Sequence, residues 1–164
     1  MTRLIALDVG AARIGVAVSD SMRFLASPYT TLYVDRGNEA KLWAEIQRCI
    51  DETEAGGLVI GLPISLDGQI HAQGERVQAF AERLKQHIDI PITFWDERLS
   101  TVEAERLIVG GEAELGKRYK TTGGRKRSQT KRRRKKQEID ALAATVILQE
   151  YLDAQMSKTR GTEQ

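Results

Sequence analysis

Short apolar runs and alternating positions dominate the first part of the chain. Residues 3–9 form a nearly continuous apolar run, which is typical of a strand buried on both faces. After the glycine at position 10, large and small side chains alternate over residues 14–19 with the period of two expected for a strand. A run rich in Thr, Tyr and Val at 29–34 predicts a third strand. Together, the three runs predict an antiparallel meander.

Helical and strand patterns alternate in the middle of the chain. Asn38 can cap a helix that runs to about residue 54, in which apolar side chains are spaced four residues apart. A short apolar run at 58–62 predicts a buried strand. A helical stripe of apolar residues follows over 77–88, and the run at 91–95 predicts another strand.

The last part of the chain is predicted to be helical on both sides of a polar stretch. Ser100 and Glu103 fit a capping box that opens a short helix, and core positions from Ile139 to Leu152 predict a final helix. The order of elements predicts an α/β fold, a mixed sheet flanked by helices, with three antiparallel strands followed by parallel ones. At this length we expect one domain over residues 1–153 and a disordered tail over 154–164.

Composition excludes several classes of protein. A single cysteine, Cys49, rules out an internal disulfide and cysteine-rich metal sites, and we expect it to fill space on a helix. No apolar run approaches the roughly 18 residues of a membrane span, and the N-terminal run is too short for a signal peptide. We therefore expect a cytoplasmic protein with no membrane partner.

Charge is distributed unevenly along the 164 residues. The 25 Lys and Arg nearly balance the 23 Asp and Glu, for a net charge of +2. However, 12 of the basic residues lie between positions 117 and 136 with no acid among them, which leaves 13 basic and 23 acidic residues elsewhere. Residues 116–136 show no apolar periodicity, so we expect a flexible loop there that binds the phosphates of nucleic acid. Its candidate contacts are Lys117, Arg118, Lys120, Arg125, Lys126, Arg127, Lys131, Arg132, Arg133, Arg134, Lys135 and Lys136.

Carboxylates stand at the ends of three predicted elements. Asp8 ends the first apolar strand, where an uncompensated charge would be costly. Asp96 and Glu97 follow the strand at 91–95, and since adjacent strand residues point to opposite faces, we expect one of them to share a site with Asp8. Asp140 lies in the first turn of the final helix. If these ends meet at one sheet edge, the acids would bind one or two Mg²⁺ or Mn²⁺ ions and could support phosphodiester hydrolysis.

Each acid also has a plain structural explanation. Asp8 could form a turn, Asp140 could be a first-turn charge, and the acids at 96 and 97 could pair with Arg98 at the surface. The glycine-containing turn after Asp8 is similar to the phosphate-binding hairpin of actin-like ATPases, whose backbone N–H groups approach an anion. Arg13 in this turn could contact a phosphate or only solvent, so an ATP-handling protein is one alternative.

Four motifs, in order, cover nearly the whole chain to about residue 152: ALDVGAARIGVAVSD, VIGLPISLDG, DERLST and EIDALAATVILQEYL. They resemble the YqgF (RuvX) family. The resemblance implies an RNase H-like fold related to RuvC-type Holliday junction resolvases, and a metal-dependent nuclease. It also implies that Asp8, Glu97 and Asp140 are the catalytic and metal-binding acids. Proteins like RuvC have a further acid three residues after the last one, where this chain has Ala143, so its metal site is expected to be leaner.

The family resemblance leaves the substrate open. Members are described as nucleases for the 5′ end of pre-16S rRNA and as Holliday junction resolvases, so structured RNA and branched DNA are both candidate partners. Paired cuts in a four-way junction require a symmetric homodimer, whereas one cut in a precursor rRNA needs only a monomer. A non-catalytic RNA- or ribosome-binding protein that keeps the fold is a further alternative.

Overall fold

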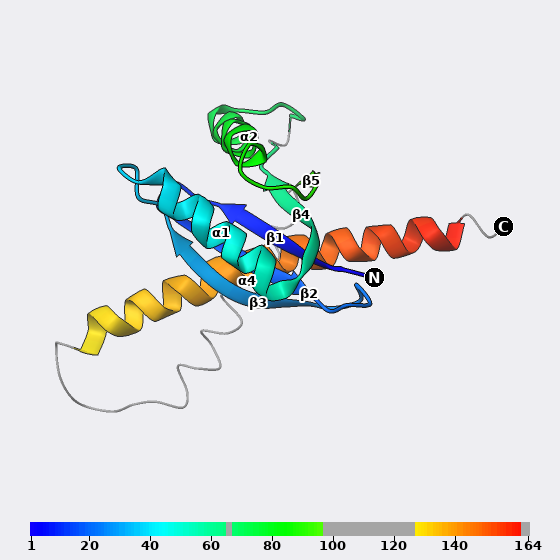
Figure 1. The fold of residues 1–164 in the computed structure, drawn as a ribbon, viewed down its shortest axis with the longest axis horizontal. Helices are drawn as coiled ribbons and strands as arrows, with labels where there is room; N and C mark the ends of the chain where they lie inside the picture. Colours follow the sequence, from blue (N-terminus) through cyan, green and yellow to red (C-terminus); the bar gives the residue numbers. More distant parts are fainter. Residues whose placement is uncertain (65–66, 97–126, 162–164) are drawn as a thin grey trace.

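The computed structural model describes residues 1–64, 67–96 and 127–161 (Figure 1). A five-stranded sheet with the strand order β3-β2-β1-β4-β5 forms its centre. The strands are β1 (Arg3–Val9), β2 (Arg13–Ser19), β3 (Ala26–Tyr33), β4 (Ala55–Leu62) and β5 (Ile92–Asp96). The helices are α1 (Glu39–Thr53), α2 (Ala72–Lys85) and α4 (Arg127–Gly161).

The pairing of the strands confirms the predicted mixed sheet. β1 pairs with β2, and β2 with β3, in antiparallel orientation. β1 pairs with β4, and β4 with β5, in parallel orientation. Parallel neighbours need a crossover connection, and α1 precedes β4 while α2 joins β4 to β5. α1 begins at its predicted cap, where the backbone N–H of Lys41 donates a hydrogen bond of 3.2 Å to Oδ1 of Asn38.

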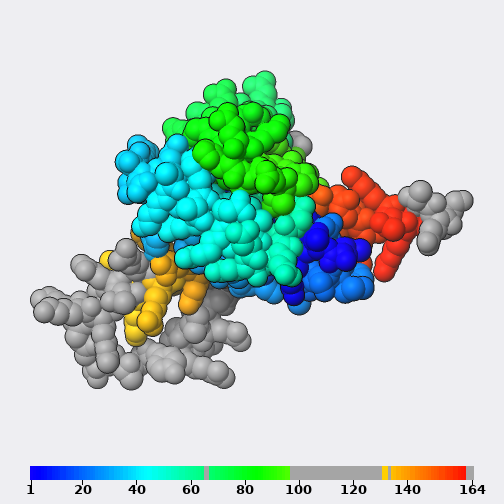
Figure 2. Space-filling view, in the orientation of Figure 1, coloured from blue at the N-terminus to red at the C-terminus, as the bar shows by residue number. Residues whose placement is uncertain are grey.

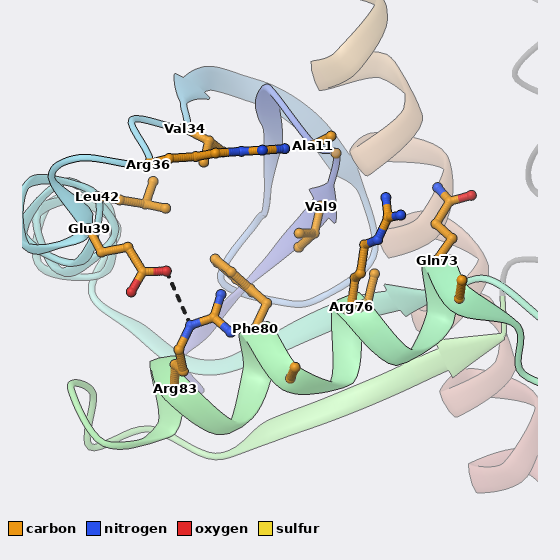
Figure 3. A pocket seen from close by; sticks show the side chains of 14 residues that line it. Val9, Ala11, Val34, Arg36, Glu39, Leu42, Gln73, Arg76, Phe80 and Arg83 are labelled. Atoms are coloured by element: carbon orange, nitrogen blue, oxygen red, sulfur yellow. Dashed lines mark hydrogen bonds and ion pairs between the residues drawn. The ribbon is translucent and has the colours of Figure 1, made fainter.

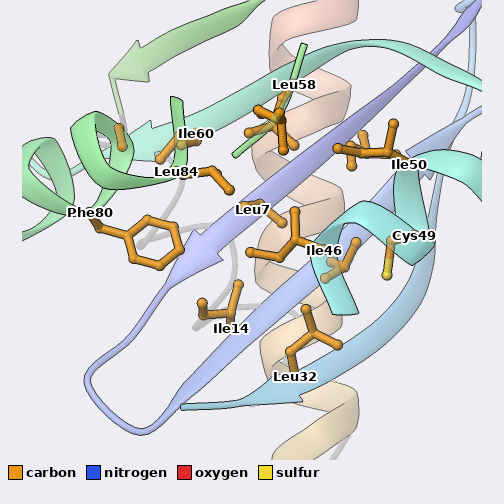
Figure 4. Close-up of a cluster of buried hydrophobic side chains, with 14 of the residues drawn as sticks. Leu7, Ile14, Leu32, Ile46, Cys49, Ile50, Leu58, Ile60, Phe80 and Leu84 are labelled. Atoms are coloured by element: carbon orange, nitrogen blue, oxygen red, sulfur yellow. The ribbon is translucent and has the colours of Figure 1, made fainter. Parts of the chain in front are cut away.

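Two separate cores pack against the two faces of the sheet. α1 and α2 cover one face, where large side chains from the strands meet those of the helices (Figure 4). Cys49 is buried in this core as predicted. α4 crosses the other face and packs Ala144, Ile147 and Leu148 against smaller residues, among them Ala6 and Ala17. α4 extends beyond the sheet at both ends (Figures 1 and 2).

α4 corrects two predictions. The helix begins at Arg127, so residues 127–136 are helical rather than part of a flexible loop, and it continues to Gly161, so residues 154–161 are not a disordered tail. The physical reason is that Lys, Arg and Gln are strong helix formers and that no Gly or Pro interrupts residues 127–160. Once the packed middle of the helix has formed, each further residue adds a hydrogen bond without a new nucleation cost.

Some predictions fall on parts of the chain that the structure does not describe. The predicted short helix from Ser100 and the first part of the basic segment, residues 116–126, lie outside the described residues. None of the helices in the described part of the chain combines the length and apolar character that crossing a membrane would require.

Candidate functional site

Asp8 lies on the sheet face that α4 covers. Side chains alternate along β1, so Ile5 and Leu7 enter the core under α1 and α2, while Leu4 and Ala6 enter the core under α4. Asp8 follows in the register of Leu4 and Ala6 and is partly buried. The first strand therefore carries a carboxylate to the end of the α4 face, as a catalytic or metal-binding role would require.

Gly15 brings α4 to the same place. In the antiparallel pairing of β1 and β2, Gly15 is the partner of Asp8. A Cβ atom built on Gly15 would lie 1.9 Å from the backbone oxygen of Asp140 and 3.1 Å from the backbone nitrogen of Ala141. The helix backbone thus rests directly on this glycine, and any side chain there would push it away. As a result, Asp140 lies over the strand position next to Asp8, and the structure brings together two of the three predicted acids.

Arg13 is held by one of these acids. Its Nε–H donates a hydrogen bond of 2.6 Å to Oδ2 of Asp140, and both side chains are partly buried. Short charge-assisted contacts of this kind fix the direction of a carboxylate. The sequence analysis gave two alternatives for Arg13, contact with a phosphate or with solvent only. It did not predict this ion pair, because no local pattern links residues that are 127 positions apart.

The sheet register separates Asp96 from the site. Asp96 pairs in parallel with Leu62, whose side chain packs in the core under α1 and α2. Residues at paired positions share a face, so Asp96 lies on the face opposite Asp8. Of the two acids at 96 and 97, Asp96 therefore does not share a face with Asp8. Glu97, the predicted third acid, lies outside the described residues.

The donor atoms of the site suit a hard divalent cation. Asp8 and Asp140 offer carboxylate oxygens, the ligands that Mg²⁺ and Mn²⁺ prefer. In the described ranges, no group of three His, Cys, Asp or Glu residues is placed to hold a metal ion. A complete site would therefore need a ligand from beyond those ranges or from water and substrate, which Mg²⁺ commonly retains.

Trp95 at the end of β5 contacts the helix that carries Asp140. Trp95 packs edge-on against Tyr151 of α4, with ring centroids 5.8 Å apart. Its Nε1–H also donates a hydrogen bond of 3.3 Å to Oε2 of Glu150. Trp95 packs against the core under α4, and these contacts attach the end of β5 to the helix that carries Asp140.

The basic part of α4 leads directly into the site. Lys136 precedes Asp140 by about one helical turn. This region is attached to β3, because Oγ1 of Thr31 donates a hydrogen bond of 2.7 Å to the backbone oxygen of Gln137, and the amide of Gln137 donates one to the hydroxyl of Tyr33. The exposed basic residues are Lys131, Arg132, Arg134, Lys135 and Lys136. Arg127 and Arg133 belong to the same helix, and Lys117, Arg118, Lys120, Arg125 and Lys126 lie outside the described residues.

Cys49 takes no part in this chemistry. Burial raises the pKa of its thiol to about 11, so the thiol stays protonated near neutral pH. A protonated thiol in the core of the opposite face cannot act as a nucleophile or bind a metal.

Comparisons with known proteins identify the family of the chain. A family model described as "RuvX: Holliday junction resolvase" matches residues 2–154. A protein of Thermoanaerobacter pseudethanolicus named "Putative pre-16S rRNA nuclease" is 38% identical over 95% of this chain and 99% of its own length. A protein of Roseiflexus with the same name is 41% identical over 93% of this chain and 95% of its own length.

A solved structure shares the fold. The structure described as "T. thermophilus RuvC in complex with Holliday junction substrate" matches 95% of this chain and 96% of its own, with a TM-score of 0.52 and 11% identity. At this identity the match concerns the fold alone, and it confirms the predicted RNase H-like architecture.

Proposed function

The chain belongs to the RuvX family of nucleases, and from this premise we propose that it is a divalent-metal-dependent endonuclease that processes the 5′ end of pre-16S rRNA in the cytoplasm. The observation that carries the proposal is the seating of α4 on Gly15, which sets Asp140 beside the strand partner of Asp8. Two carboxylates brought together from distant parts of the chain repel each other unless positive charge compensates them, which Arg13 does for Asp140 and a bound divalent cation would do for both acids.

In this proposal Asp8, Glu97 and Asp140 hold one or two Mg²⁺ or Mn²⁺ ions. Glu97 is the third ligand because Asp96 lies on the opposite face of the sheet and because the family resemblance assigns the role to Glu97. Such an ion, when bound, supplies an activated water and neutralises charge on the phosphate during hydrolysis. The oxygen donors of Asp8 and Asp140 support this assignment.

Arg13 and the basic part of α4 bind the substrate. Arg13 orients the carboxylate of Asp140 through its 2.6 Å contact, and its guanidinium offers further N–H donors for a phosphate oxygen. The lysines and arginines of residues 131–136 hold the phosphate backbone next to the acids. Phosphate contacts of this kind position a substrate without reading its sequence. We therefore expect recognition of structured RNA to depend on its shape.

The RNA assignment rests on the names of the curated relatives and on the single cut that rRNA maturation requires. A second candidate is a Holliday junction resolvase, which the description of the matching family favours. Symmetric cleavage of a four-way DNA junction needs two sites related by a two-fold axis, and hence a homodimer.

A cleavage panel tests these alternatives. A labelled pre-16S rRNA 5′ leader and a labelled four-way DNA junction would each be incubated with Mg²⁺, Mn²⁺ or EDTA. We expect cleavage of the leader with either metal and none in EDTA. The variants Asp8→Asn and Asp140→Asn should lower the rate at least about 100-fold, because even residues that only support metal ligands contribute 10- to 100-fold. Asp153→Asn, an exposed acid on the same helix, serves as the matched control.

The other outcomes separate the candidates. Symmetric cuts in the junction alone, lost in the Asp140 variant, would assign the resolvase function and predict a dimer in solution. Binding of the leader without cleavage in any metal would contradict the proposed chemistry and favour a non-catalytic RNA-binding protein. Equal rates for the wild type and both site variants would contradict the assignment of Asp8 and Asp140.

A further inference from the structure

A cleft of about 860 Å³ lies on the face of the sheet opposite the acids (Figure 3). Its walls come from α1, α2, the segment between β3 and α1 that carries Val34 and Arg36, and the tip of the β1–β2 hairpin, where Gly10 and Ala11 line it. The volume is in the range of clefts that hold small molecules or segments of larger ligands. The site proposed above does not use this cleft, because Asp8 and Asp140 face the other side of the sheet.

The charge in the cleft is positive and concentrated at one end. Arg36 and Arg76 extend into it from opposite sides near Ala11 (Figure 3). At the other end, Nε of Arg83 donates a hydrogen bond of 3.1 Å to Oε1 of Glu39, which links α2 to α1 and neutralises both groups. Within the described part of the chain, neither Arg36 nor Arg76 has an acidic partner of this kind. The end beside the hairpin therefore offers two guanidinium groups to an anion.

The remaining surface of the cleft is mainly apolar. Its larger apolar lining residues are Val9, Val34, Leu42, Val77 and Phe80, and Gln73 adds a polar side chain. Two guanidinium groups above an apolar floor suit a ligand that combines phosphate charge with a flat, weakly polar body, which is the chemistry of a nucleotide. A purely inorganic anion would leave the floor uncovered.

The cleft lies close to the acid site along the chain. Val9, which lines it, follows directly after Asp8, and the two side chains point to opposite faces of the sheet. The two sites thus meet at the end of β1, beside the hairpin tip at Gly10 and Ala11. A nucleic-acid strand that passes Asp8 could therefore turn around this tip and place its next nucleotides between Arg36 and Arg76.

We propose that the arginine cleft, defined by Arg36, Arg76 and its apolar floor, binds phosphodiester-linked nucleotides of the substrate strand that continues past the acid site. The inference rests on the proposed function in that it takes the ligand to be a nucleic acid. Free nucleotides share the same phosphate and base chemistry, and the experiment separates the two sources.

Binding is measured without metal, so that cleavage plays no part. The probe is a fluorescein-labelled single-stranded RNA of 12 nucleotides in EDTA, followed by fluorescence anisotropy over a range of salt concentrations. The double variant Arg36→Ala/Arg76→Ala should bind roughly 10-fold more weakly. The slope of log affinity against log salt should become shallower by about 1.4, since each phosphate contact to a single strand contributes about 0.7.

A matched control removes the same amount of charge at positions outside the cleft. Arg48→Ala/Lys85→Ala takes one cation from α1 and one from α2, and neither residue lines the cleft. This variant should keep the wild-type slope. Thermal unfolding of both double variants establishes that any loss of binding is not a loss of fold. An equal loss in the two variants would mean that only net charge matters and would overturn the proposal.

Competition distinguishes the ligand source. Adenosine monophosphate and inorganic phosphate are added to the labelled complex, and their direct binding to the double variant is compared with that to the wild type. Strong binding of the monophosphate that the double variant loses, with unchanged binding of the 12-mer, would assign the cleft to a free nucleotide and overturn the proposal. If the slope changes as expected while the enzyme cleaves neither substrate above, the cleft inference stands and the proposed nuclease chemistry fails.

Discussion

The face of the sheet under α1 and α2 differs from the face under α4 in the size of the side chains that the strands supply. On the first face, β1 and β2 offer Leu7, Ile14 and other large residues, which fill the space below two helices (Figure 4). On the second face, the same strands offer Ala6, Gly15 and Ala17. Large side chains keep a helix at the usual distance from a sheet, whereas small ones let its backbone approach.

As a result, neighbouring residues of one strand have different roles, one in the stability of the core and the next in the acid site. Leu7 and Asp8 are neighbours in β1, but one is fully buried in the larger core and the other belongs to the acid site. Because α4 approaches closely, the backbone of Asp140 lies against Gly15, and this contact sets the position of Asp140 relative to the sheet. Changes to the large buried side chains of the first face should therefore lower the free energy of unfolding, and changes at Asp8 or at Asp140 should mainly lower activity.

The largest effect on stability is expected from Leu7→Ala. Removing a fully buried leucine leaves a cavity and should lower the free energy of unfolding by about 2–5 kcal/mol. Urea denaturation followed by circular dichroism measures this change. Cleavage per folded molecule should stay close to the wild-type value. Asp8→Asn, one residue further along, should keep the free energy of unfolding near the wild-type value and lose cleavage. Loss of cleavage by folded Leu7→Ala protein would contradict this division of roles.

An intermediate effect, on both properties, is expected from Gly15→Ala. The added Cβ would meet the backbone of Asp140 at 1.9 Å, so α4 must shift. Overpacking of this kind costs about 1–3 kcal/mol, and the displaced Asp140 should also lower the cleavage rate.

Gly57→Ala in β4 is the control for this substitution. There the new Cβ would meet only the end of the Leu4 side chain, at 2.7 Å, which can rotate away. We expect this variant to keep its activity. If Gly15→Ala cleaved at the wild-type rate, the proposed role of the glycine in seating Asp140 would be wrong.

The smallest effect concerns Cys49 and the pH dependence of stability. Because burial raises the pKa of this thiol to about 11, the folded protein holds its proton at pH values where the unfolded chain has released it. The stability that the protonated Cys49 thiol contributes is therefore complete below about pH 9 and is lost as the pH rises toward 11. Unfolding free energies of the wild type and Cys49→Ala, measured at pH 8 and 10.5, should converge as the pH rises. A difference in unfolding free energy that stays the same at both pH values would contradict the raised pKa of this thiol.

Much of the fold followed from local patterns. The alternation in β2, the apolar run of β1 and the Asn38 cap of α1 each depend on neighbours a few residues apart, and the structure confirms all three. The start of α4 was predicted wrongly, because the absence of apolar residues over 127–136 was taken to mean a loop. Helix propensity and extension from a packed segment outweighed that signal.

The candidate site was only partly accessible from the sequence. Position at the end of a predicted element singled out Asp8, the acids at 96 and 97, and Asp140, and the family motifs favoured Glu97 over Asp96. The placement of Asp140 in a first helical turn was wrong, because α4 begins at Arg127 and Asp140 lies well inside it. The contact between Arg13 and Asp140, the attachment of Trp95 to α4 and the arginine cleft had no local signal. Each depends on elements that are distant in sequence and adjacent only after the sheet has formed.

By itself, the sequence determined the order and type of most elements, the acids available for catalysis and the membership of the RuvX family. Only the tertiary structure decided that α4 rests on Gly15, that Asp96 faces away from Asp8 and that Arg36 and Arg76 face one cleft. The reason is physical. Strand and helix periodicity act over a few residues, whereas the approach of a helix to a sheet depends on the summed packing of side chains from both.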